Sequence, residues 1–74
     1  MVITAIERPD AGATLWSGEA KIGKQNLLWF YWPRRWLHVQ EQDRRNPSCW
    51  MNIKPPDGAR EAVLRAVRKA RQCA

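Results

Sequence analysis

The stretch from Asn26 to Glu41, NLLWFYWPRRWLHVQE, constrains the fold of this chain more than any other feature. Aromatic and β-branched residues are concentrated in both of its halves, as is typical of β-strands. Pro33, Arg34 and Arg35 interrupt the stretch in the middle, and such a break between two strand-like runs predicts a turn. We therefore expect a β-hairpin that turns one face to a core and the other to a ligand.

Four further segments of the chain also have the pattern of regular structure. Together with the hairpin they predict strands at residues 2–7, 14–22, 27–32, 35–42 and 49–54, separated by turns rich in Pro, Gly, Asp and Asn. Gly18 lies inside the second of these strands. A glycine in that position predicts a β-bulge or a close approach of another group.

The last segment is expected to be a helix over residues 57–72, with Asp57 as its N-cap. Its apolar residues have the spacing of an amphipathic helix and are Ala59, Ala62, Val63, Ala66, Val67 and Ala70. No linker or internal repeat divides the chain. The sequence thus predicts a single domain over residues 1–74, an α+β fold in which an antiparallel β-meander of four to five strands is followed by one C-terminal α-helix.

The chain is short and strongly basic. Its 74 residues are near the lower limit for a single unaided core, so a homodimer is a physical expectation. Lys and Arg number 13 against 7 acidic residues, a net charge of +6, and nine of the 13 are Arg. Guanidinium groups bind phosphate in a bidentate manner, and cations release counterions from nucleic acids. The charge therefore favours a nucleic-acid partner, with a merely solvated basic face as the alternative.

Several functional classes lack the residues they need. No apolar run approaches the roughly 20 residues that span a bilayer, and Met1–Thr4 lacks the features of a signal peptide. Cys49 and Cys73 are the only cysteines, and a single His cannot complete an ordinary zinc site. We expect a cytoplasmic protein with reduced thiols, no metal, no cofactor and no membrane partner. A disulfide between the two cysteines stays open.

The alternation within the strands predicts which side chains face a ligand. One helix can cover only one face of such a sheet, and that face is expected to hold Leu28, Phe30, Leu37, Val39, Met51 and Ile53. The other face would carry Trp29, Tyr31, Trp36, His38 and Trp50, with Lys21, Asn52 and Lys54 at its rim and Arg34 and Arg35 at the turn. Rings interleaved with cations suit a single strand of DNA or RNA, because each base stacks on a ring for about 1–3 kcal/mol while the cations follow the phosphates.

Other interpretations of these residues remain open. The aromatic face could be buried under a second subunit, a bent strand or the N-terminal hairpin. Duplex recognition through the basic helix is a further possibility, although the helix lacks Asn or Gln at base-reading spacing. The alternative function is a small accessory protein of the phage or plasmid type that binds a protein partner through its Trp-rich face. A ribonuclease that uses His38 with Glu19 or Glu41 is the weakest interpretation; without a catalytic motif we expect no enzymatic activity.

Four short runs also follow one another between about Ala20 and Ala70, with few identities beyond their order and spacing. They are Lys21-Ile22-Gly23-Lys24, Pro33-Arg34-Arg35, Val39-Gln40-Glu41 and, before a Pro-preceded helix, Trp50-Met51-Asn52-Ile53. In order and spacing they resemble the positive cofactor four family of transcriptional coactivators. The resemblance implies a curved antiparallel sheet with one helix, a dimer formed through the helix and adjoining strands, and binding of single-stranded DNA. It implies DNA contacts from Lys24, Arg34, Tyr31 and Trp36.

Three features depart from the pattern of that family. Pro-Arg-Arg stands where the family has a turn of the Lys-Gly-Lys kind, the helix has no aromatic residue near its start, and the hairpin at Met1–Ala13 is additional. These departures bear on the dimer interface and on the path of the bound strand. The sequence thus predicts a non-catalytic, homodimeric protein that binds single-stranded nucleic acid, with a coactivator-like role implied by the resemblance.

Overall fold

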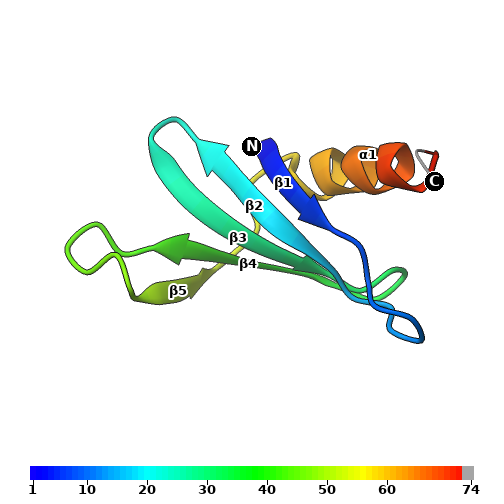
Figure 1. The fold of residues 1–74 in the computed structure, drawn as a ribbon. Coiled ribbons are helices and arrows are strands. Elements are labelled where there is room, and N and C mark those ends of the chain that lie inside the picture. The colour runs from blue at the N-terminus through cyan, green and yellow to red at the C-terminus, as the bar shows by residue number, and fades with distance from the viewer. Residues whose placement is uncertain (73–74) are drawn as a thin grey trace.

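The computed structural model describes residues 1–72 as one antiparallel sheet followed by one helix (Figure 1). The elements are β1 (Val2–Glu7), β2 (Trp16–Ile22), β3 (Gln25–Tyr31), β4 (Leu37–Gln42), β5 (Trp50–Ile53) and α1 (Ala59–Gln72). The five strands lie in the sheet in sequence order. The expected α+β meander with a C-terminal helix is confirmed. Cys49 is an exposed free thiol, and Cys73 lies outside the described residues.

The element boundaries differ from the sequence prediction by no more than two residues at any end. The largest difference of consequence is at the start of α1, which begins at Ala59. The Gly58 carbonyl accepts the hydrogen bond of the Ala62 N–H at 3.1 Å, and Gly58 has a φ of 78°. Gly58 therefore holds the N-cap position that the sequence assigned to Asp57.

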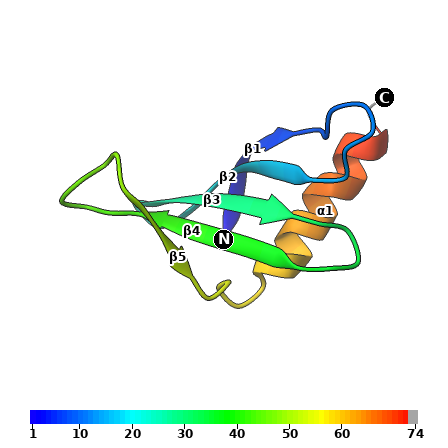
Figure 2. The same ribbon diagram turned by 90° about the horizontal axis from the view of Figure 1, so that it is seen from below.

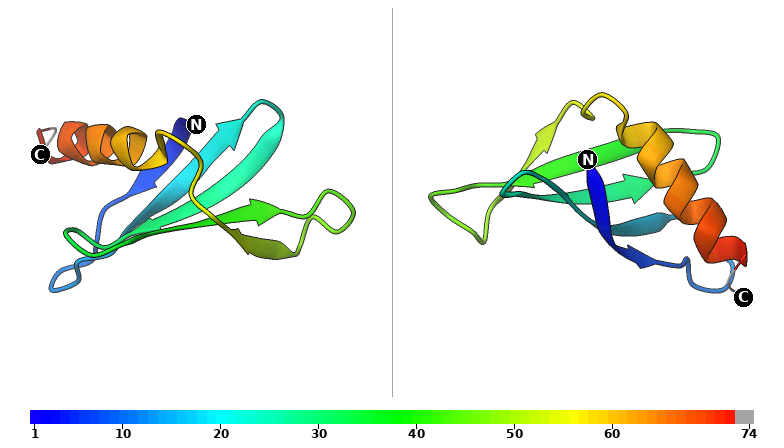
Figure 3. Two further views of the ribbon diagram at one scale, coloured as in Figure 1. Left: turned by 180° about the vertical axis from the view of Figure 1, so that it is seen from behind. Right: turned by 90° about the horizontal axis from the view of Figure 1, so that it is seen from above.

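Helix α1 crosses one face of the sheet, from the β4 side to the β1 side (Figures 2 and 3). It lies toward the end of the sheet that carries the β1–β2 loop and the β3–β4 turn, whereas the β4–β5 turn projects away from it (Figure 1). The residues of α1 that are fully buried are small: Ala59, Val63 and Val67. Small side chains let the helix approach the sheet closely. Ala70 also packs against the core, whereas Ala62 and Ala66 of the predicted apolar stripe are half-buried and line a surface pocket with Met1, Val2 and Ile3.

The core fills the space between α1 and the covered face of the sheet. The sheet contributes Trp16, Ala20, Leu27, Trp29, Tyr31, Leu37 and Val39. Trp29 is the largest of the completely buried side chains, and its indole Nε1 donates a hydrogen bond to the Glu19 carbonyl oxygen at 3.2 Å. Its polar atom is thus satisfied inside the core, as a buried tryptophan requires.

Trp29 fits into this core because Gly18 lies opposite it on β2. A Cβ atom at Gly18 would lie 2.6 Å from Cζ2 of Trp29 and 2.1 Å from the Ala5 carbonyl oxygen. The neighbouring strand β1 has a register shift between Ile3 and Ala5, as occurs at a β-bulge. The glycine in β2 therefore marks both a close approach and a bulge in the neighbouring strand.

The orientation predicted for β3 is wrong. Trp29 (0% exposed) and Tyr31 (5%) belong to the core, and Leu28 and Phe30 are half-buried on the uncovered face. Both sets of β3 side chains are apolar, so hydrophobic alternation alone does not decide which set points inward. Pairing with β4 decides it, because Trp29 lies opposite Val39 and shares its side of the sheet.

Strand β5 is less buried than the sequence predicts. Met51 was expected in the core but is 46% exposed, and of the inward-facing β5 residues Ile53 packs against the core cluster. Met51 lies toward the β4–β5 turn, at the end of the sheet that α1 does not cover (Figure 1). A single diagonal helix thus leaves one corner of its own face open.

Candidate nucleic-acid interface

The β3–β4 connection is a tight turn with a tryptophan at each side of its base. The Arg35 N–H donates to the Trp32 carbonyl oxygen, and the Trp32 N–H donates to the Trp36 carbonyl oxygen, both at 3.0 Å. Pro33 has the fixed negative φ of proline, and Arg34 follows it with a φ of 64°. This combination is that of a type II turn. The predicted turn is confirmed, and we call residues 32–36 the basic tip.

Two cross-strand ring pairs lead from the basic tip onto the uncovered face of the sheet. Trp32 and Trp36 have ring centroids 5.1 Å apart and planes inclined by 51°. Phe30 and His38, the next pair, have centroids 6.1 Å apart. Trp36 is 53% exposed, and the other three rings are half-buried. Trp36 is therefore the ring of this set that offers the most free surface.

Arg34 has a backbone conformation that arginine seldom adopts. It is the only non-glycine residue among residues 1–72 with a positive φ. The left-handed conformation costs a residue with a Cβ about 1–2 kcal/mol, and type II turns usually place Gly or Asn there. Backbone strain of this kind is concentrated at functional positions. Because the side chain is exposed, the observation favours a role for the guanidinium group.

Substitution of Arg34 by glycine is expected to raise the stability of the fold while weakening its ligand binding. Removing the Cβ relieves the strain and should gain up to about 1 kcal/mol, or roughly 4–8 °C in Tm. Thermal denaturation followed by circular dichroism measures this shift. Arg34→Asn is the matched control for the loss of charge. Asn lacks the charge, as Gly does, but it keeps a Cβ and tolerates the left-handed conformation. A lower Tm for Arg34→Gly would contradict the strain.

A cavity of about 570 Å³ lies beside the basic tip, and we call it the end cavity. Its walls come from the β1–β2 loop, β2, the tip and α1, through Pro9, Ala13, Thr14, Trp16, Trp32, Pro33, Arg35 and Arg71. Within residues 1–72, the side chains that line the cavity provide two indole rings and two guanidinium groups but no carboxylate. The cavity thus combines an aromatic surface with uncompensated positive charge.

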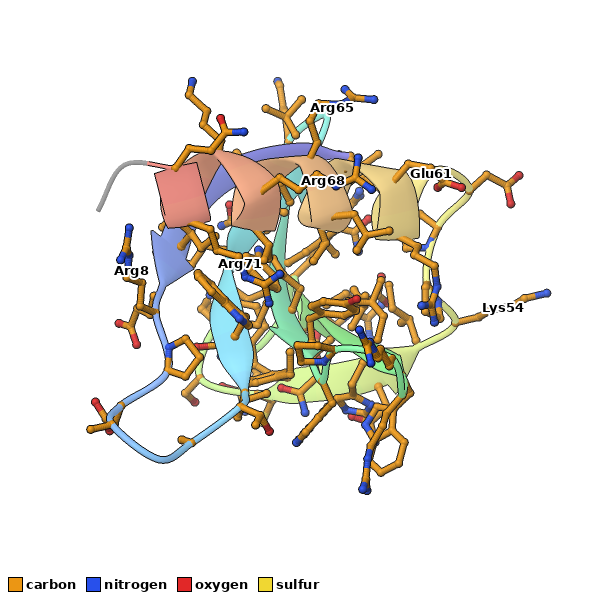
Figure 4. The ribbon with its side chains drawn as sticks, turned by 90° about the vertical axis from the view of Figure 1, so that its right-hand side faces the viewer. Arg8, Lys54, Glu61, Arg65, Arg68 and Arg71 are labelled. Carbon is orange, nitrogen blue, oxygen red and sulfur yellow. The ribbon has the colours of Figure 1, made fainter. Side chains whose placement is uncertain are left out.

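Arg71 reaches the end cavity from the last turn of α1. In Figure 4 its side chain lies on the sheet side of the helix, whereas Arg65 lies on the far side. The Arg71 guanidinium carbon is 5.5 Å from the ring centroid of Trp16, within the range of a cation–π contact. Arg8 Nη2 donates a hydrogen bond to the Ala70 carbonyl oxygen, one of the last-turn carbonyls that lack helical partners. This bond fixes the helix end next to β1 and so positions Arg71.

The uncovered face carries a row of polar side chains on β4 and β5. His38 Nε2 and Asn52 Oδ1 are 2.9 Å apart, and Gln40 Nε2 donates to the same oxygen at 3.0 Å. The ribonuclease interpretation would need a carboxylate beside His38. Glu41 shares the covered side with Leu27, and Glu19 lies on β2, with β3 between it and β4. The fold therefore joins His38 to an amide and places both candidate carboxylates elsewhere.

The part of the uncovered face over β1 to β3 has a different chemistry. A groove of about 300 Å³ is lined there by Leu28 and Phe30 and rimmed by Glu7 and Glu19. Both carboxylates are exposed. Carboxylates repel phosphate groups because both are negatively charged, so this groove is unfavourable for a nucleic-acid strand. The acidic rim thus gives this groove a charge opposite to that of the basic tip.

The structure brings part of the predicted site together. Arg34, Arg35 and Trp36 form the exposed part of the basic tip, and His38 follows on β4. Trp29 and Tyr31 are excluded from the site by their burial in the core. Among the predicted residues, Arg34, Arg35, Trp36 and His38 thus stay together at the hairpin, and the two buried rings do not join them.

Three other predicted residues lie apart from the basic tip. Lys24 lies in the β2–β3 turn and Trp50 begins β5 beside Gln42, so both are at the opposite end of the sheet. Lys54 follows β5 and points away from the body of the protein (Figure 4). A ligand held at the tip alone does not reach Lys24 or Trp50. The 7 residues of β3, each with a rise of about 3.3 Å, separate the two ends of the sheet.

The residues that sequence reasoning missed are Trp32, Trp16 and Arg71. Trp32 had a detectable signal, since it and Trp36 stand symmetrically about Pro33-Arg34-Arg35 and must meet across a tight turn. Trp16 and Arg71 had none, because only the docking of α1 on the sheet brings them together.

Within residues 1–72 no helix has the length and hydropathy needed to cross a bilayer. Over the same residues, no group of three or more His, Cys, Asp or Glu side chains is arranged to hold a metal ion. Comparisons with protein-family models, with curated proteins and with solved structures gave no match to this chain.

Proposed function

We propose that this protein binds single-stranded nucleic acid through the basic tip and the rings next to it. The observation that carries the proposal is Trp36, a half-exposed indole that directly follows two exposed arginines on a strained turn. A base can stack on the exposed ring while the guanidinium groups bind the adjacent phosphates.

The charge distribution supports the same site. The exposed surface of α1 carries five cations and one carboxylate, namely Arg60, Arg65, Arg68, Lys69 and Arg71 with Glu61. This basic helix lies at the same end of the sheet as the basic tip (Figures 1 and 2). Clustered charge of one sign raises the local concentration of a polyanion and its rate of association. The carboxylates of Glu7 and Glu19 lie over β1 and β2, on the other side of β3 from β4.

The form of the site favours single strands over duplexes. Stacking on Trp36 requires an unpaired base, whose face is free. Reading of a duplex groove would fall to α1, whose exposed face has charged side chains that suit phosphates but lacks Asn or Gln at base-reading spacing. The proposal includes the resemblance to the positive cofactor four family. It also includes a homodimer, a cytoplasmic location and a non-catalytic role in transcription.

A comparison of two arginine pairs tests the proposal. Arg34→Gln/Arg35→Gln and Arg44→Gln/Arg45→Gln remove the same charge from exposed turns at the two ends of β4. We expect the tip pair to weaken binding of a labelled single-stranded oligonucleotide by about tenfold or more, because charged hydrogen bonds contribute about 1.5–3 kcal/mol each. The pair in the β4–β5 turn should change it by about threefold at most. Fluorescence anisotropy measures both.

The salt dependence of the same titrations gives a second readout. Loss of two phosphate contacts should make the slope of log K against log salt shallower by about 1.4, since each contact to a single strand contributes about 0.7. Equal losses in the two double variants would show that binding reflects net charge and not the tip. No binding by the unaltered protein at low salt would overturn the proposal.

A protein partner is the second candidate, favoured by the groove over β1 to β3. Its apolar floor of Leu28 and Phe30 with a rim of Glu7 and Glu19 suits a peptide that carries both apolar and basic side chains. Such a partner would be captured equally well after nuclease treatment. Its capture would also survive substitution of the tip arginines, which separates it from the first candidate.

A further inference from the structure

We infer that the end cavity binds the phosphate-bearing terminal nucleotide of a strand held at the basic tip. The inference rests on the proposed function and adds the chemical group that the protein distinguishes. Its ligand is a phosphate monoester joined to a nucleoside, at either the 5′ or the 3′ end of the strand.

The charge of the end cavity matches a terminal phosphate better than an internal one. Arg35 and Arg71 both line it, and its lining within the described residues contains no carboxylate to neutralise them. A phosphate monoester carries about −1.5 to −2 charges near neutral pH and presents three acceptor oxygens. A phosphodiester within a strand carries a single charge and has two free oxygens. Two guanidinium groups are thus better satisfied by a chain end.

The rings of the end cavity have separate tasks. Trp16 is 6% exposed, and the Arg71 guanidinium lies over it at 5.5 Å. A guanidinium group that stacks on a ring keeps its N–H groups, which lie in its own plane, available for phosphate. Trp32 is half-buried and, with Pro33, forms the wall that belongs to the basic tip. Trp16 therefore orients Arg71, and Trp32 is the surface for the terminal base.

The size and location of the end cavity agree with this ligand. Its volume of about 570 Å³ is within the roughly 300–1,000 Å³ of small-molecule sites. Arg35 belongs both to the basic tip and to the cavity lining, so a strand bound at the tip has its next nucleotide at the cavity. The bond from Arg8 to the Ala70 carbonyl holds the helix end that carries Arg71, which makes Arg8 a positioning residue.

The test compares three labelled single-stranded oligonucleotides of one sequence, with a 5′-phosphate, with a 3′-phosphate, and with hydroxyl groups at both ends. The full chain is expected to bind one phosphorylated form about tenfold more tightly than the hydroxyl form. Arg71→Gln should reduce this preference to less than about twofold. Arg68→Gln, which makes the same charge change one turn earlier outside the cavity, should retain it. Arg71→Lys should lose most of it, because lysine lacks the planar stacking group.

A second variant keeps the test independent of helix packing. Thr14 is exposed and lines the cavity, so Thr14→Glu adds a carboxylate there without disturbing the core and should also abolish the preference. Competition by a free deoxynucleoside monophosphate should exceed that by the deoxynucleoside or by inorganic phosphate alone. Equal binding of the three oligonucleotides would overturn the inference and leave the proposed function intact. Absence of binding to all three would overturn both.

Discussion

Replacement of Gly18 by alanine is expected to lower the free energy of unfolding by about 3 kcal/mol or more. The added Cβ would lie within 2.1 Å of the Ala5 carbonyl oxygen and 2.6 Å of the Trp29 ring, so β1 and the central core residue would both have to move. Domains of this size have a total stability of roughly 5–15 kcal/mol. Thermal denaturation should show the loss as a fall in Tm of about 12–24 °C.

Gly23→Ala provides the control for this substitution. Gly23 has a φ of 57°, and a Cβ there would have no neighbour within 4 Å. Its cost is therefore that of the left-handed backbone alone, about 1–2 kcal/mol. Gly18→Ala tests crowding by the added Cβ, whereas Gly23→Ala tests backbone strain alone. Comparing the two variants therefore separates the two effects. A Tm for Gly18→Ala equal to that of Gly23→Ala or higher would show that β1 yields to the extra methyl group.

Loss of the Trp36 ring is expected to weaken binding of a single-stranded oligonucleotide by about ten- to a hundredfold. Stacking of one base contributes about 1–3 kcal/mol, and each 1.4 kcal/mol corresponds to a factor of about ten in affinity. Trp36→Ala should cost little stability by comparison, since the ring is 53% exposed and its pairing with Trp32 is worth about 0.5–1.5 kcal/mol. Anisotropy titration and thermal denaturation measure the two effects.

Two matched variants locate the stacking site. Trp36→Phe keeps an aromatic face and should recover much of the affinity. Trp50→Ala removes a ring from the far end of the uncovered face, beside Gln42, and should leave the affinity within about threefold. Equal losses from Trp36→Ala and Trp50→Ala would instead indicate that the strand lies along the whole face and is not confined to the basic tip.

The sequence was sufficient to predict the fold wherever one face of an element is clearly polar. The alternation of β4 placed Leu37 and Val39 in the core, and the spacing in α1 placed Val63 and Val67 there. Strand β3 offers no such contrast. Its orientation follows from tertiary pairing and from the space that Gly18 provides for Trp29, and neither is visible in β3 itself.

The same distinction applies to the candidate site. The turn at Pro33–Arg35 and the exposure of Trp36 are local properties, and the sequence predicts both. The strain at Arg34 is local too, but it requires the turn type, which follows from the bond between Arg35 and Trp32. The end cavity depends on Trp16 meeting Arg71, which are 55 positions apart in the chain. No pattern within either segment indicates that contact.

The order of the strands has a consequence for how the chain folds. Each strand pairs with its neighbours in sequence, so the sheet can form by successive closure of short loops, each with a small entropy cost. The bond between Arg8 and Ala70 joins residues 62 positions apart and ties the two ends of the chain together. Contacts between neighbouring strands form fastest in such a topology. The contacts of α1 with β1 join the elements that are farthest apart in the chain. The end cavity is therefore complete only when α1 is docked on the sheet, because Arg71 and Trp16 meet through that contact.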